Sequence, residues 1–137
     1  MFKLMVTVLL ALGLSAADLP LKSGFIQAHT EVFGDSAIEP STNKISSSLQ
    51  MEDGIESLKG TIHINTLDLK SDKEKRDANM YELLQATLHP VISFEIIKIV
   101  KNEQNYTVVG NLSLNGVTKL ISSEATITQR EEEINLF

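Results

Sequence analysis

The fold of this chain is decided by the stretch YTVVGNLSLNGVTK, residues 106–119. From Tyr106 to Leu114, apolar and polar side chains alternate with the period of a β-strand that buries one face. Asn115-Gly116 follows directly, and this pair suits a type I′ turn because both positions of that turn need a positive φ angle. The stretch therefore predicts a β-hairpin whose second strand runs from Val117 to about Thr128.

Strand-like patterns continue on both sides of this hairpin. We expect further strands at residues 25–33, 44–51, 58–65, 91–100 and 134–137, separated by polar turns that include residues 129–133. Strands joined by short turns are antiparallel, and both a β-sandwich and a β-barrel fit the series. Nearly every strand carries Ile, Leu, Met or Phe on one face while aromatic residues are few, which favours a barrel with an apolar interior.

One segment between the third and fourth expected strands departs from this alternation. Ser71 and Glu74 fit a capping box with Ser71 as the N-cap, so residues 72 to about 84 are expected to form a helix. Met80 and Leu84 lie on its apolar edge. The sequence thus predicts a mainly β domain with one short inserted helix.

The first residues have the layout of a secretory signal peptide. A charged start at Lys3 precedes an apolar run from Leu4 to Leu14, and the small residues Ser15-Ala16-Ala17 follow. The alternative is a membrane anchor, but a spanning helix needs about 20 apolar residues. We therefore expect residues 1–17 to be removed after Ala17, leaving a domain of residues 18–137 that is periplasmic or secreted and makes no stable membrane insertion.

Composition and charge exclude several classes of function. The chain has no cysteine, which rules out disulfides and thiol catalysis. Without Lys3 it carries 11 basic and 18 acidic side chains, a net charge of −7. Binding to a nucleic acid requires clustered Lys and Arg, so we expect no nucleic-acid partner.

Catalytic and metal-binding patterns are weak throughout the sequence. His29 and Glu31 are two residues apart on an expected strand and could offer two metal ligands, but surface polarity explains the pair more simply. No G-x-S-x-G nucleophile elbow and no HExxH motif occur. We expect neither an enzyme nor a bound cofactor or metal.

Three ordered motifs resemble those of the YceI-like family. They are the stretch Leu69 to Met80 before and within the expected helix, His89 to Phe94 (HPVISF), and Gly110 to Lys119 (GNLSLNGVTK). The resemblance implies an exported, lipocalin-like antiparallel barrel of eight strands that binds a polyisoprenoid or a similar amphiphilic lipid. Seven strands are expected here, and family members are usually longer. We therefore also expect that the last strand is lacking and that unpaired strand edges support a homodimer.

The apolar parity of each strand defines the candidate ligand-binding residues. A tail is expected to lie along Phe94, Leu112 and Ile62, with a polar headgroup near Arg76 or Lys119. The alternative is a non-catalytic structural or protein-interaction module in which the same residues form a filled core. The full predicted set is Ile45, Leu49, Met51, Ile62, Ile64, Met80, Leu84, Ile92, Phe94, Ile96, Val108, Leu112, Leu114 and Ile127.

Overall fold

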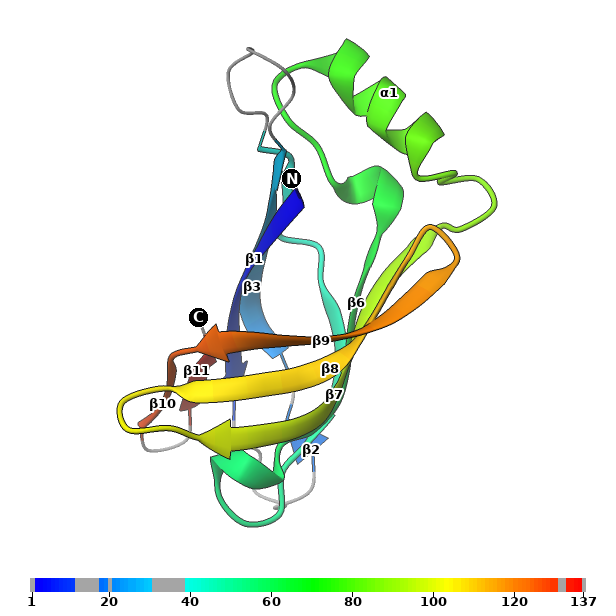
Figure 1. Cartoon of the computed structure of the whole chain (residues 1–137). Coiled ribbons are helices and arrows are strands. Elements are labelled where there is room, and N and C mark those ends of the chain that lie inside the picture. The colour runs from blue at the N-terminus through cyan, green and yellow to red at the C-terminus, as the bar shows by residue number, and fades with distance from the viewer. Residues whose placement is uncertain (1, 12–17, 20, 31–38, 131–132, 137) are drawn as a thin grey trace.

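The computed structural model describes residues 2–11, 18–19, 21–30, 39–130 and 133–136, and these form two antiparallel sheets and one α-helix (Figure 1). The five-stranded sheet has the order β10-β11-β1-β3-β4, and the six-stranded sheet has the order β2-β5-β6-β7-β8-β9. The prediction of a mainly β fold with one short helix is confirmed. The bounds are β1 Phe2–Ala11, β2 Asp18–Leu19, β3 Leu21–Thr30, β4 Ser41–Thr42, β5 Ser46–Gln50, β6 Lys59–Asn65, α1 Glu74–Leu83, β7 Val91–Lys101, β8 Tyr106–Leu114, β9 Val117–Ala125, β10 Ile127–Arg130 and β11 Glu133–Leu136, with short 3-10 turns at Ile55–Ser57 and Thr66–Asp68.

The hairpin that decides the fold forms as expected, from β8 and β9. Its two turn residues have positive φ angles, 53° at Asn115 and 71° at Gly116. The tip docks on the region that follows α1, since a Cβ atom on Gly116 would lie 2.6 Å from Cε1 of His89. The Asn115 amide also donates a hydrogen bond to the carbonyl of Leu83 (3.4 Å). Glycine at this position therefore serves both the turn and the contact between the hairpin and the helical segment.

The single long strand expected from Val117 to Thr128 is wrong. The chain leaves the six-stranded sheet at Ala125 and enters the five-stranded sheet at Ile127, so that β9 and β10 belong to different sheets. Both flanking residues are buried, which makes Thr126 a corner between the two sheets. Residues 127–130, part of which was expected to be a turn, are the strand β10.

A β-bulge in β7 corrects a second expectation. Strict alternation places Ile99 on the face opposite to Ile96, yet Ile99 is only 3% exposed and belongs to the core. The pairing of β7 with β8 shifts between Ile96 and Lys98, so Ile97 is an extra residue in the strand. The bulge returns Ile99 to the buried face, while Val100 is 37% exposed.

The N-terminal segment expected to be a signal peptide supplies a strand in the structure. Residues 2–11 form β1, which pairs with β3 along its length and with β11 through its C-terminal part. Its removal after Ala17 is untested and stays a prediction. The first expected strand, 25–33, is observed as β3 from Leu21 to Thr30, and Glu31 lies outside the described residues.

The helix begins later than expected, and the predicted capping box is wrong. The N-cap is Lys73, which has no side-chain cap hydrogen bond. The residue that reaches back is Asp77, which is 5% exposed. Its carboxylate accepts hydrogen bonds from the backbone N–H of Ser71 (2.8 Å) and from the Ser71 hydroxyl (2.7 Å), while the Ser71 hydroxyl oxygen accepts from the Lys73 N–H (3.1 Å). A charge-assisted pair therefore fixes the start of α1.

Ser71→Ala is expected to lower the free energy of unfolding by about 1.5–3 kcal/mol, because it removes a hydrogen bond to a buried carboxylate. Urea denaturation followed by circular dichroism measures the change. Ser123→Ala is the matched control, since that exposed hydroxyl bonds only weakly to a neighbouring carbonyl (3.3 Å). Equal stability of the two variants would show that the Ser71–Asp77 pair does not hold the helix.

Candidate functional site

The candidate site is the inner face of the six-stranded sheet, which we define as the face that carries Leu49, Ile62, Ile96 and Val108. Strand pairing aligns five predicted or neighbouring positions into one row across the sheet. This central row consists of Ser47, Ile62, Phe94, Leu112 and Lys119, each opposite the next. At the usual strand spacing of about 4.8 Å, the row is roughly 19 Å long. The tail path expected from the sequence is thus a continuous line of cross-strand neighbours.

Burial decreases along the inner face toward β9. Ile62 on β6 is 6% exposed, whereas Phe94 and Leu112 are half-buried. On β9, Val117 is 52% exposed and Lys119 is exposed as well. The β6 side of this face is therefore dry core, as is the end of the β8–β9 hairpin that carries Val108 and Ala125. The turn end of that hairpin presents apolar side chains that a ligand could cover.

Gly110 positions the aromatic ring of the central row. A Cβ atom at this buried glycine would lie 2.5 Å from Cζ of Phe94 and 2.3 Å from the backbone oxygen of Glu95. The Phe94 ring therefore lies across β8 in space that any larger residue at Gly110 would occupy. This contact fixes the ring beside Leu112, its cross-strand neighbour.

The structure divides the predicted ligand-binding residues into two groups. Eight are buried members of one core cluster, and five pack against that cluster while remaining partly exposed. Leu84, the C-cap of α1, is half-buried. Of the headgroup candidates, Lys119 is exposed at the end of the central row and Arg76 is half-buried on α1. Which of these residues contact a ligand stays a prediction. The buried group is Leu49, Met51, Ile62, Ile64, Ile92, Ile96, Val108 and Ile127, and the partly exposed group is Ile45, Met80, Phe94, Leu112 and Leu114.

The ligand-binding set predicted from the sequence does not contain Ser47. Ser47 lies opposite Ile62 and shares the parity of Leu49, so it is on the inner face. Its hydroxyl oxygen is buried and has no hydrogen-bond partner among the residues that the structure describes. Ile121, which lies opposite Gly110 and is 36% exposed, was also left out, although its parity with Ala125 could have identified it.

Helix α1 is fastened near one end of this face. Met80 packs against the core cluster, and the Tyr81 hydroxyl donates hydrogen bonds to the carbonyls of Leu69 (2.7 Å) and Leu67 (3.2 Å). Burial raises the pKa of Tyr81, and the carboxylates of Asp77 and Asp68 raise it further. The phenol therefore stays protonated at neutral pH and remains a hydrogen-bond donor. The described part of the chain contains no helix long and apolar enough to span a membrane.

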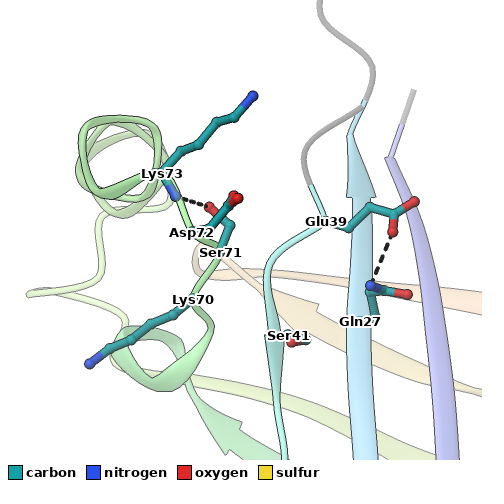
Figure 2. A pocket seen from close by; sticks show the side chains of 7 residues that line it. All are labelled: Gln27, Glu39, Ser41, Lys70, Ser71, Asp72 and Lys73. Atoms are coloured by element: carbon teal, nitrogen blue, oxygen red, sulfur yellow. Dashed lines mark hydrogen bonds between the residues drawn. The ribbon is translucent and has the colours of Figure 1, made fainter. Parts of the chain in front are cut away.

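A separate polar hollow of about 450 Å³ lies between β3 and β4 on one side and the segment that leads into α1 on the other (Figure 2). Gln27, which lines it, sits between the buried residues Ile26 and Ala28, so the hollow opens on the other face of β3. Glu39 accepts a hydrogen bond from the Gln27 amide (3.1 Å) and contacts Nδ1 of His29 (3.1 Å). Within the described residues, no group of three or more His, Asp and Glu could hold a metal ion. The residues that line the hollow are Gln27, Glu39, Ser41, Lys70, Ser71, Asp72 and Lys73.

Comparisons with known proteins agree with this geometry. The family model of the YceI-like domain matches residues 22–136. A UPF0312 protein of Yersinia enterocolitica is 38% identical over 72 residues, which cover 51% of this chain and 38% of that protein. A UPF0312 protein of Yersinia pestis (strain Pestoides F) is 31% identical over 107 residues, which cover 76% of this chain and 56% of that protein. The chain thus spans between about a third and just over half of such relatives.

A solved structure shares the fold. The crystal structure of Burkholderia cenocepacia BcnA superposes with a TM-score of 0.65, covering 96% of this chain and 92% of that chain. At 11% sequence identity this likeness supports the architecture alone.

Proposed function

Since this chain belongs to the YceI-like domain family, we propose that it is an exported lipid-binding protein that holds a prenyl chain or another long amphiphile on the inner face of a β-barrel. The family is known for lipid and isoprenoid binding and is generally non-catalytic. One observation carries the proposal for this chain. Apolar side chains continue along the inner face to the turn end of the β8–β9 hairpin, where the described residues leave them partly uncovered: Phe94 and Leu112 are half-buried and Val117 is 52% exposed.

The physical basis of binding is the removal of hydrocarbon from water. Each buried CH₂ group contributes about 0.8 kcal/mol, so a tail along the central row gains affinity with each added carbon. Such a site requires shape and apolarity with a few polar groups at its ends. Lys119 at the rim provides a cation for a polar or anionic headgroup.

In the uncleaved chain, the arrangement of the sheets supports the barrel form of this proposal. Removal of residues 1–17 would take β1 out of the five-stranded sheet. The chain passes from one sheet to the other four times, between β1 and β2, β2 and β3, β4 and β5, and β9 and β10. Strands β7 to β9 also run across the direction of β1 and β3 (Figure 1). Sheets that cross steeply and share strands at corners pack as orthogonal barrels.

Export is part of the same proposal and is supported by the order of Lys3, the apolar run Leu4–Leu14 and the small residues before Asp18. It would place the mature domain in the periplasm or outside the cell, where it would meet lipids that leave a membrane. Association of two copies through strand edges stays a prediction.

A second candidate function is a structural or protein-interaction module. It is favoured by the burial of residues such as Leu49 and Ile64, which are 2% and 3% exposed and already fill the β5–β6 part of the face. In this alternative, the exposed apolar side chains near β9 would contact a protein instead of a lipid.

Organic extraction of the protein purified without detergent, followed by mass spectrometry, tests the proposal. We expect a prenyl or other long-chain amphiphile at close to one molecule per chain. The extracted protein should then bind all-trans farnesol, and an apolar fluorescent probe should be displaced in the process. Extracts free of lipid, together with no farnesol binding, would favour the interaction module.

A further inference from the structure

Residues 2–11 have two roles, one in export and one in the folded sheet, and they cannot fulfil both at the same time. As most of the expected signal peptide, they must be free of the folded domain so that the export machinery can bind and remove them. In the folded chain they are β1, an interior strand of the five-stranded sheet, between β11 and β3. This conflict lies within one ten-residue segment.

The pairing of β1 is extensive on both of its sides. Its register with β3 runs from Phe2 opposite Thr30 to Leu10 opposite Leu21, and its register with β11 runs from Val8 opposite Leu136 to Ala11 opposite Glu133. Withdrawal of β1 would leave the backbone N–H and C=O groups of two neighbouring strands unpaired. The sheet therefore opposes release of the segment.

We propose that residues 2–11 act as a switch between folding and export. Once β1 pairs with β3 and β11, the signal peptide is no longer accessible to the export machinery. This inference rests on the export signal proposed above. A precursor that folds first is retained with its leader, whereas a precursor that is bound first by the export machinery is processed. The relative rates of folding and recognition then decide the fate of each molecule.

The positions that hold β1 can be altered without changing the signal itself. Ile134 on β11 is fully buried and lies opposite Leu10, and Ile26 on β3 is 4% exposed and lies opposite Val6. A charge at Ile134 weakens the partner of β1 but leaves residues 1–17 intact. Leu120 on β9 offers a matched control, because it is 67% exposed and lies in the other sheet.

Pulse-chase labelling of the full chain in a Gram-negative host measures leader removal. We expect Ile134→Asp to shorten the half-life of the precursor at least threefold relative to the parent, and Leu120→Asp to leave it unchanged. Equal processing of the parent and Ile134→Asp would overturn the switch while leaving export itself supported. Retention of Met1 in every version would overturn the export proposal and the switch together.

Hydrogen exchange on the purified, uncleaved parent protein provides a second measurement that needs no variant. The amides of residues 2–11 should exchange at least a hundredfold more slowly than those of an unstructured peptide of the same sequence. Exchange at the peptide's rate would show that the segment is not a strand in the folded chain, and would overturn the inference even if processing rates differed.

Discussion

Leu112→Lys is expected to abolish binding of a prenyl lipid. Leu112 lies at the middle of the inner face, between Phe94 and Lys119 in the central row. The substitution places an ammonium group where the tail is expected to lie, and burying a charge without a partner is strongly unfavourable. It also puts two like charges directly opposite each other on β8 and β9, which destabilises the pair of strands. Titration with farnesol, monitored by displacement of an apolar fluorescent probe, measures the loss.

Asn111→Lys is the matched control for this charge. Asn111 is adjacent in β8 but faces the other side of the sheet, where its amide contacts the Glu95 carboxylate (3.4 Å). The new ammonium group would lie beside that carboxylate and outside the proposed site. We expect this variant to bind farnesol like the parent, within twofold. Equal loss of binding in both variants would mean that the charge acts on the fold and not on a ligand.

Phe94→Ala is expected to reduce lipid binding more than stability, and Ile96→Ala is expected to reduce stability more than lipid binding. The two residues lie two positions apart on the same face of β7. Ile96 is 4% exposed, so its truncation should cost about 2–5 kcal/mol of stability. Phe94 is half-buried, so its truncation should cost less than the roughly 3–5 kcal/mol of a fully buried Phe. It should instead weaken farnesol binding at least tenfold.

Urea denaturation of the lipid-free proteins and farnesol titration of the folded ones separate the two variants. If Phe94→Ala loses as much stability as a buried Phe and the parent holds no lipid, the inner face is a filled core. Retained farnesol affinity in Phe94→Ala would remove Phe94 from the proposed site without excluding the rest of it.

The elements that could be predicted from the sequence are those that local chemistry determines. The Asn115-Gly116 turn needs positive φ angles, and the alternation from Tyr106 to Leu114 fixes which side chains face inward. A one-residue slip would expose every apolar residue of such a strand, so its parity is reliable. The bounds of β8 accordingly agree with the expectation.

The elements that could not be predicted depend on contacts distant in sequence or on local irregularities. The corner at Thr126 exists because two sheets share one stretch of chain, and nothing in the alternation of residues 117–128 marks it. The start of α1 is fixed by Asp77, one turn beyond the Glu74 that the capping-box pattern selects. The bulge at Ile97 adds a residue without any glycine or proline to signal it.

The candidate site shows the same division. Parity placed Ile62, Phe94 and Leu112 on one face, and the strand register aligns them. Parity alone could not distinguish dry core from an accessible surface, because that depends on what the other sheet covers. The exposure of Val117 and Ile121, and the lack of a hydrogen-bond partner for the Ser47 hydroxyl among the described residues, become visible only when the two sheets are placed together.

The bulge in β7 has a consequence for how the gene can change. Because Ile97 is an additional residue between two segments that are both in register with β8, the loss of its codon would leave every other side chain of β7 on its present face. Loss of a codon from the regular part of the strand, such as that of Phe94, would move the side chains on one side of the deletion to the opposite face of the sheet. Strand β7 therefore contains one internal position, Ile97, at which the loss of a residue would preserve the alternation of the strand.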